Sequence, residues 1–482
     1  RKIIHDCDCT FGINGCDVDD GLALLYLLGD PEAEVLGVTT TYGNNTLEKV
    51  YENTKKFVKK IGHDELRVYK GGATPGETES EAAHYLAEMA EKYAGELEIL
   101  VTGSVTNLYG AWKHNPEFFH QVKSIVLMGG TTEPLIFAKR EMDELNFSCD
   151  PLATYATLTS GTDVAVITGN NCLKVLFTRE EYERELSDLS KGVVRLIKNE
   201  TDYWFDNNWD EYGIPGYYNW DAIAAAYMMH PELFEIQRVD MQLSTEKLTK
   251  GRLILAEDET KKNCTLKIPV IRDADEFRRN LYDTWMNVEI ETSIIIPTYN
   301  EESTIERLME TLEPLNERCE ILFVDGGSTD GTLALLKDRY PVIQSPKGRA
   351  KQMNMGAEES SGDVLFFLHC DSEVPPTALE EIETVMKKYR AGCFGIAFHS
   401  YNFFMFTCRV ISNHRIKDRK VMFGDQGIFI DRKLFFEVGK FPEMPILEDY
   451  QFSLILKEKG IPLGMTRHRI YTSDRRFGGN TI

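Results

Sequence analysis

The sequence predicts an α/β protein of two domains, each a mostly parallel sheet with flanking helices. Three observations lead to this prediction: the chain length, an alternation of short apolar runs with amphipathic stretches, and a restart of that alternation near residue 290. At 482 residues the chain is longer than one hydrophobic core usually supports. The apolar runs are short and rich in β-branched residues, as in strands buried on both faces. We place the domains at 1–289 and 290–482.

The first domain alternates expected strands with expected helices. After KII near the N-terminus, the expected strands are 34–43, 98–105, 124–130 and 163–169. Amphipathic segments at 47–62 and 80–95 lie between them, and 273–289 is the expected closing helix. The second series begins with ETSIIIPTYN and continues with CEILFVDGGSTDGT and GDVLFFLHCDSE. Ligands of such sheets bind where parallel strands end, so polar residues after each strand are candidate site residues.

Composition restricts the function classes. The formal charge of −23 argues against a general nucleic-acid binder, although nucleotides can still bind in local pockets. The sequence has no apolar stretch long enough to span a bilayer and no signal-peptide pattern, so we expect no transmembrane segment and a cytoplasmic location. The ten cysteines lack the spacing of zinc sites and are expected to be reduced thiols.

Aspartates crowd just ahead of the first expected helix, GLALLYLL. They are Asp6, Asp8, Asp17, Asp19 and Asp20. Helix capping explains one or two of them, but a larger group of like charges repels unless a cation lies among them or some are protonated. Hard divalent cations prefer carboxylate oxygens, so the pattern fits a metal site, with a solvated acidic loop as the alternative.

Three later stretches supply further polar or aromatic candidates. They are Asn44 in GNNT, Glu144 and Asn146 in ELN, and Trp220 and Asp221 in NWDA. Taken singly, an Asn after a strand is an ordinary turn residue, and an Asp at a helix start is an ordinary cap.

The ordered set resembles the inosine–uridine nucleoside hydrolase family. That family carries Asp-x-Asp and Asp-Asp after its first strand, here Asp6-Cys7-Asp8 and Asp19-Asp20. The likeness continues through GVTTTYGN, VTGSVTNL, IVLMGG, ELN and WDA, and spans about residues 3–288. An ordered series of matches is far more specific than one motif.

The resemblance implies Ca²⁺-dependent hydrolysis of the N-glycosidic bond of a ribonucleoside. The implied Ca²⁺ ligands are Asp8, Asp20, the carbonyl of Thr102, and Asp221. Asp8 is also the implied base, taking a proton from a water on the metal before that water attacks the anomeric carbon. The residues implied to bind or line the ribose are Asp19, Asn44, Met128, Glu144 and Asn146.

Two features depart from the family pattern. The loop CTFGINGCDV between Asp8 and Asp19 is longer than usual, and it either displaces Asp8 from Asp20 or bulges outward. A histidine often precedes the last metal-binding Asp, where this chain has Trp220. Trp cannot donate a proton at neutral pH, but its face can stack on a base. Trp in this place resembles the purine-preferring branch, so we expect Trp220 to bind a purine, with core packing as the alternative.

The second domain carries a Gly- and Ser-rich turn, VDGGSTDGT, after a strand. Such a turn can approach a nucleoside or phosphate closely, and a plain tight turn has the same composition. Asp371 and Glu373 follow another strand, where paired carboxylates can hold Mg²⁺ or Mn²⁺ beside a diphosphate. Glu448 and Asp449 open an apolar helix, which capping alone also explains.

These stretches resemble a family 2 glycosyltransferase with the GT-A fold, and more closely the radical-SAM/selenodomain-associated transferases. The closer likeness lies in PKGRAKQMNMGA, FLHCDSE, GDQGIFI and FPEMPILEDYQFS. The residues implied to hold the nucleoside of a nucleotide sugar are Pro297, Tyr299 and Asp325. Asp371 is the implied metal ligand with Glu373 nearby, and Asp449 is the implied base of an inverting transfer.

Arg349 and Lys351 are expected to neutralise phosphate, with a solvated basic turn as the alternative. The full prediction is a bifunctional enzyme that acts on a small-molecule nucleoside and a nucleotide sugar, binds no nucleic acid, and forms a homo-oligomer. The alternative is that one domain, in particular the hydrolase, is a non-catalytic module that binds a nucleoside or sugar.

Overall fold

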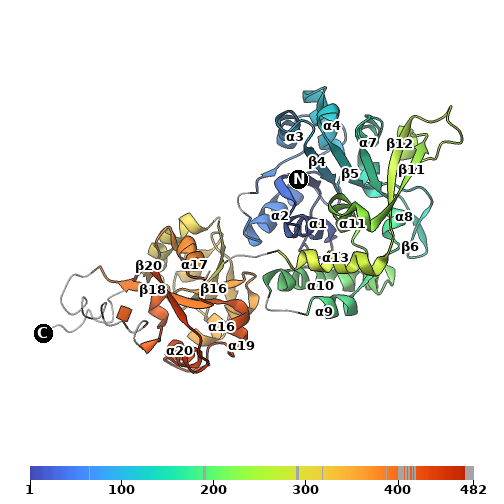
Figure 1. The fold of residues 1–482 in the computed structure, drawn as a ribbon. Helices are drawn as coiled ribbons and strands as arrows, with labels where there is room; N and C mark the ends of the chain where they lie inside the picture. The colour runs from blue at the N-terminus through green and yellow to red at the C-terminus, as the bar shows by residue number, and fades with distance from the viewer. Residues whose placement is uncertain are drawn as a thin grey trace. The chain divides into compact units, whose positions relative to one another are not determined.

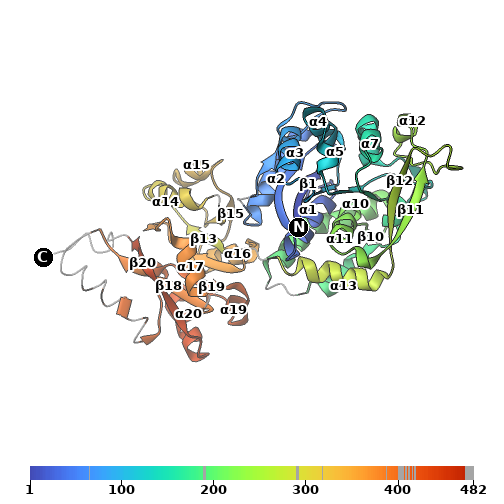
Figure 2. The ribbon, with the colours of Figure 1, turned by 45° about the horizontal axis from the view of Figure 1, so that its top comes forward.

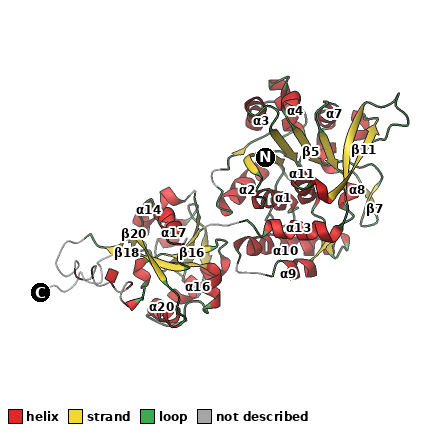
Figure 3. Cartoon of the chain, in the orientation of Figure 1, coloured by secondary structure: helices red, strands yellow, loops and turns green. Residues whose placement is uncertain are grey.

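The computed structural model describes residues 1–63, 66–187, 191–288, 292–316, 318–386, 388–399, 407, 410, 413–414, 416 and 419–472. The chain forms two compact α/β units, of which the first holds nearly all of residues 1–288 (Figures 1 and 3). The predicted boundary at 289–290 lies outside the described residues and stays a prediction.

The first unit is built on an eight-stranded sheet in the order β11-β12-β8-β5-β4-β1-β2-β3. The predicted strands form its centre: β1 (Lys2–Cys7), β2 (Glu34–Thr40), β4 (Leu97–Val101), β5 (Ser124–Met128) and β8 (Val164–Ile167). These strands are parallel. The edges are β3 (Val68–Tyr69) and β11 (Phe234–Met241), and β11 runs antiparallel to β12 (Cys264–Ile271).

Helices cover both faces of this sheet (Figures 1 and 2). On one face, α3 (Glu81–Lys92), α4 (Thr106–His114) and α7 (Pro151–Leu158) pack into a shared apolar core with β4 and β5. On the other face, α1 (Asp19–Gly29) packs against α11 (Trp220–Met229). Both helices are buried on nearly every side, because GLALLYLL and AIAAAYMM have no polar face. Their acidic first turns therefore enter the interior, beside the carboxyl ends of the strands.

The second unit holds another eight-stranded sheet, in the order β15-β14-β13-β16-β19-β18-β20-β17. Its parallel part contains the three predicted strands, β13 (Thr292–Thr298), β14 (Glu320–Asp325) and β16 (Val364–Phe367), together with β15 (Val342–Gln344). The remaining strands are β17 (Ser372–Glu373), β18 (Ala391–Ala397), β19 (Ile428–Asp431) and β20 (Leu463–Thr472). Antiparallel pairs join β16 to β19, β19 to β18 and β20 to β17, whereas β18 and β20 pair in parallel.

Separate apolar clusters cover the two faces of this second sheet. One cluster contains α14 (Ile305–Leu312) and α17 (Ala378–Met386). The other contains α16 (Arg349–Glu359), α19 (Arg432–Glu437) and α20 (Glu448–Glu458). The predicted fold class is confirmed in both units. Within the described residues, no helix combines the length and apolar composition that crossing a membrane requires.

Candidate active site

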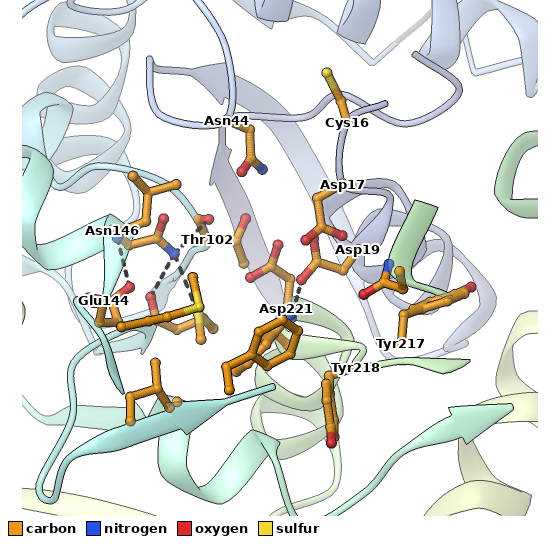
Figure 4. A pocket seen from close by; sticks show the side chains of 18 of the residues that line it. Cys16, Asp17, Asp19, Asn44, Thr102, Glu144, Asn146, Tyr217, Tyr218 and Asp221 are labelled. Atoms are coloured by element: carbon orange, nitrogen blue, oxygen red, sulfur yellow. Dashed lines mark hydrogen bonds between the residues drawn. The ribbon is translucent and has the colours of Figure 1, made fainter. Parts of the chain in front are cut away.

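A cavity of about 340 Å³ opens at the carboxyl ends of the strands of the first unit (Figure 4). Most predicted residues of the hydrolase site line it: Asp19, Asn44, Thr102, Met128, Glu144, Asn146, Trp220 and Asp221. Asp8 and Asp20 lie one layer deeper, each bonded to a residue of the lining. Asn44 donates a hydrogen bond to Asp8, and the Thr102 hydroxyl donates one of 2.6 Å to Asp20 Oδ1.

Three carboxylates converge at the floor of the cavity. Oxygens of Asp19, Asp20 and Asp221 all lie within 4.8 Å of one another. Asp19 and Asp20 stand in the first turn of α1, and Asp221 stands in the first turn of α11. Two positive helix ends therefore point at the group. Among the described residues that line the cavity, none is Lys, Arg or His, so no side-chain cation there balances these charges.

The electrostatics of this group fit a bound divalent cation. Burial, and then the charges of neighbouring aspartates, raise the pKa values of Asp20 and Asp221 well above the usual range. Burial also raises the pKa of Asp8 to about 6. A cation among the carboxylates would favour their charged forms and reverse these shifts. Because the donor set consists of oxygens, it suits a hard ion such as Ca²⁺.

Asn44 holds Asp8 and Asp20 together. Its backbone N–H donates to Asp8 Oδ2, while its side-chain nitrogen lies 3.4 Å from Asp8 Oδ1 and 3.3 Å from Asp20 Oδ2. The preceding residue must be glycine, because a Cβ on Gly43 would lie 2.1 Å from Asp8 Oδ2. The long loop after Asp8 has therefore not separated the two aspartates.

That loop folds inward and becomes part of the site. Phe11 is buried, with its ring centroid 4.7 Å from that of Phe57, and it lies against Gly21 of α1. Cys16 and Asp17 consequently line the cavity. Burial raises the pKa of Asp17 to about 6. The sequence placed Asp17 in the acidic group but assigned it no role.

Asn146 organises the opposite wall. Its side-chain nitrogen donates to the carbonyls of Thr102 (3.0 Å) and Met128 (3.1 Å). The Thr102 carbonyl keeps a second lone pair for the predicted metal contact. Glu144 caps the helix of Asn146 by accepting the N–H groups of Asn146 (2.7 Å) and Phe147 (2.9 Å). Burial raises the pKa of Glu144 to about 7, and its contact with ribose stays a prediction.

Aromatic side chains form the remaining wall, and Phe137, Trp204 and Tyr212 among them were not predicted from the sequence. Trp220 lies with its ring centroid 5.5 Å from Tyr218 and 6.1 Å from Phe137. Phe137 belongs to a hairpin of β6 (Leu135–Phe137) and β7 (Arg140–Met142), and α10 (Gly192–Tyr212) adds Trp204 and Tyr212. The spacing of four between residues 204, 208 and 212 places them on one helix face and was a usable signal.

In the second unit, the predicted nucleoside-binding residues lie together at the carboxyl ends of two adjacent parallel strands. Asp325 ends β14 directly beside Thr298 of β13, and Pro297 and Tyr299 flank Thr298. The Gly- and Ser-rich turn wraps around the Asp325 carboxylate, which accepts the N–H groups of Gly327 (2.9 Å) and Ser328 (3.0 Å). The predicted turn is thus built around this carboxylate.

The predicted metal and base residues of the second unit lie near Arg349. Asp371 and Asp449 are close enough for their charges to act on Arg349, which itself pairs with the buried Glu448. Asp449 Oδ2 accepts the N–H of Gly424 at 2.6 Å. Arg349 therefore has an internal partner, and its contact with phosphate stays a prediction, as does that of the exposed Lys351.

Glu373 is engaged elsewhere in this structure. Its Oε1 lies 2.7 Å from the Arg307 guanidinium and 2.9 Å from His399 Nε2. A metal at Asp371 would have to compete with this pairing for the Glu373 carboxylate, so its role beside the metal stays a prediction.

Comparisons with known proteins give two families. Residues 3–279 match the family described as inosine-uridine preferring nucleoside hydrolase, and residues 293–441 match glycosyl transferase family 2. The chain is 26% identical over 277 residues to a probable uridine nucleosidase 1 of Oryza sativa subsp. japonica, covering 51% of this chain and 84% of the relative. It is 24% identical over 316 residues to an inosine-uridine preferring nucleoside hydrolase of Leishmania major, covering 58% and 95%.

A solved structure shares the first fold. A purine-preferring ribonucleoside hydrolase from Gardnerella vaginalis superposes with a TM-score of 0.52 at 26% identity, over 60% of this chain and 99% of that one.

Proposed function

Because the chain belongs to the inosine-uridine preferring nucleoside hydrolase family and carries a glycosyl transferase family 2 domain, we propose that it acts both as a hydrolase and as a transferase. Both families expected from the sequence are confirmed, and the chain is an enzyme. From this premise we propose that the first unit hydrolyses the N-glycosidic bond of a purine-like ribonucleoside with the aid of Ca²⁺. The main support is the convergence of Asp19, Asp20 and Asp221 at the floor of a cavity with an aromatic wall.

In this proposal Asp8, Asp20, Asp221 and the Thr102 carbonyl hold the ion. A Ca²⁺ ion held there would lower the pKa of a water that it binds. Asp8 accepts the proton of that water, and Asn44 keeps the Asp8 carboxylate oriented through two hydrogen bonds. The sugar develops oxocarbenium character as the bond to the base breaks.

The aromatic wall orients the leaving base. Trp220 offers its face to a planar base, and Tyr218 and Phe137 fix the Trp220 ring by lateral contact. None of the described lining residues is a histidine, so the base leaves without an imidazole acid from the cavity wall. A purine suits this arrangement, because it can take its proton from solvent.

The test is ribose release from inosine, adenosine, guanosine, uridine and cytidine, with Ca²⁺ or with a chelator. We expect ribose release from the purine nucleosides, and we expect the chelator to abolish that release. A protein that binds Ca²⁺ but releases ribose from none of these substrates would contradict the proposal and favour a non-catalytic binding module.

Removing the Trp220 ring is expected to weaken purine binding. Stacking of a base on an aromatic ring contributes about 1–3 kcal/mol, so Trp220→Ala should raise KM for inosine by roughly 5- to 150-fold. Trp220→Phe should recover much of this loss. Trp209→Ala is the matched control, since Trp209 is 61% exposed on α10 and does not line the cavity. An unchanged KM in Trp220→Ala would assign Trp220 to packing.

For the second unit we propose inverting glycosyl transfer from a nucleotide sugar. Asp325, Tyr299 and Pro297 hold the nucleoside, and Asp371 binds Mg²⁺ or Mn²⁺ at the diphosphate. Asp449 accepts the proton of the acceptor hydroxyl. The support is that Asp371 and Asp449 both lie near Arg349. Arg349 is the first residue of α16, which follows the nucleoside-binding strands in the chain.

Loss of the Asp371 carboxylate is expected to remove the metal-dependent part of nucleotide binding. We would titrate UDP, GDP and CDP by calorimetry with and without Mn²⁺. The tightest of these should bind Asp371→Asn about 10- to 100-fold more weakly in Mn²⁺, since a metal held by Asp371 would contribute to diphosphate binding. Glu359→Gln, an exposed acid of α16, is the control and should bind like wild type. Equal Mn²⁺ dependence in Asp371→Asn would exclude Asp371 as the metal ligand.

A further inference from the structure

A second group of potential metal ligands lies on the surface of the first unit. Glu79 precedes α3, His84 stands in the first turn of α3, and His114 ends α4. None of the three lines the active-site cavity. We propose that Glu79, His84 and His114 bind a divalent transition-metal ion such as Zn²⁺.

The distances match those of ligands around one ion. One potential ligand atom from each residue lies within 4.8 Å of the other two. His84 Nε2 is 3.2 Å from one oxygen of Glu79, and His114 Nε2 is 3.5 Å from the other. Ligand atoms bound to a tetrahedral Zn²⁺ at about 2.0–2.1 Å lie about 3.3 Å apart. The spacing of the ligand atoms is therefore already close to that which one ion requires.

The carbonyl of Thr78 adds a fourth candidate ligand. It lies 2.9 Å from His114 Nε2, which donates a proton to it when no metal is bound. A metal ion at Nε2 would take the place of that proton, which the neutral ring would then carry on Nδ1. The ion could use the carbonyl oxygen as well.

The two imidazole rings must turn before they can share one ion. The rings of His84 and His114 stack with centroids 3.9 Å apart and planes 27° apart. The lone pair of each ring nitrogen lies in the plane of its ring, so nearly parallel rings do not yet direct their nitrogens to one point. Rotation of the exposed His84 side chain would bring the two nitrogens to a common ion.

The packing of α3 on α4 holds the group in place. A Cβ on Gly110 of α4 would lie 2.7 Å from the Ala83 Cβ and 2.9 Å from the Thr78 carbonyl oxygen, so only glycine allows this close approach. The Ser80 side chain caps α3 by accepting the N–H of Ala83 at 3.1 Å. His84 and His114 are thus presented from two fixed helices.

The ligands of this surface site favour a different ion from the one that the aspartates of the active site favour. Imidazole nitrogens with one carboxylate suit Zn²⁺ and its transition-metal neighbours, whereas Ca²⁺ prefers the all-oxygen set of the aspartate group. His84 and Glu79 are 58% and 77% exposed, so solvent can complete the coordination shell. An ion here would link the start of α3 to the end of α4.

The test is calorimetric titration of Zn²⁺ into the full chain saturated with Ca²⁺ and Mg²⁺. We expect Zn²⁺ to bind at one site, and we expect His84→Ala and Glu79→Ala each to weaken that binding on the order of 100-fold. Loss of a residue that only hydrogen-bonds to a metal ligand already costs up to about 100-fold at other metal sites. Binding should weaken at acidic pH, because protons compete with Zn²⁺ for the ring nitrogens. His120→Ala, an exposed histidine of α5 (Phe118–Gln121), is the matched control.

Unchanged Zn²⁺ affinity in His84→Ala and Glu79→Ala would overturn the proposal, as would an equal loss in His120→Ala. Co²⁺ provides a second readout: its visible spectrum should show nitrogen and oxygen ligation, and a thiolate band would assign the ion to cysteine instead. Circular dichroism and Ca²⁺-dependent ribose release establish that each variant is folded.

Discussion

Asp8→Asn is expected to lower kcat for ribose release by on the order of 10³- to 10⁴-fold, the upper range for loss of a general base. The Asp8 carboxylate is fully buried behind the cavity, and Asn44 fixes it through both its backbone and its side chain. An amide in its place cannot accept the proton of the attacking water. The measurement is ribose release at saturating inosine and Ca²⁺.

Asp143→Asn is the matched control for this prediction. Asp143 also lines the cavity, but it is exposed and lies outside the group of converging aspartates. It should release ribose at close to the wild-type rate. Calorimetric Ca²⁺ binding separates the two roles of Asp8: loss of rate with Ca²⁺ still bound identifies the base, and loss of both identifies a ligand. A near wild-type rate in Asp8→Asn would exclude the proposed base.

The central strands and the acidic site were predictable for the same physical reason. Parallel strands buried on both faces appear as apolar runs, and their carboxyl ends must meet at one edge of the sheet. Residues distant in sequence, such as Asp20, Thr102 and Asp221, therefore come together once the strand order is set. The outer strand β11 carried a weaker pattern, because an antiparallel edge strand needs no such uniform apolar run.

The aromatic wall and the ion pairs were not predictable in this way. Phe137 and Tyr212 come from a hairpin and a helix whose approach to the cavity depends on tertiary packing. Only the four-residue spacing in α10 hinted at a shared face. The pairing of Arg349 with Glu448, 99 residues later, has no local pattern at all. Sequence motifs predicted which residues gather at the acidic site, whereas the shape of that site required the structure.

Removal of Ca²⁺ is expected to destabilise the first unit, and the loss should grow as pH rises. In the metal-free protein, burial raises the pKa of Asp8 from 3.8 to about 6, so the folded state favours the protonated acid. That contribution to stability is full below about pH 3.8 and is lost as pH rises through about 6. Asp20 and Asp221 shift in the same direction. Ca²⁺ instead requires the ionised carboxylates, so its stabilising effect increases over the same pH range.

Thermal unfolding with Ca²⁺ and with a chelator, followed from pH 5 to pH 8, measures this effect. Ligand at 1,000 times its Kd stabilises by about 4 kcal/mol, which is enough to separate the two curves clearly at pH 8. The two units can unfold separately, so the transition that responds to Ca²⁺ is the one to compare.

Asp221→Asn is the informative variant, because it removes one ligand and one repelling charge together. Without metal at pH 8 it should be more stable than the wild type, and it should lose the response to Ca²⁺. A wild-type Tm that chelation leaves unchanged at pH 8 would show that no cation stabilises the aspartate group.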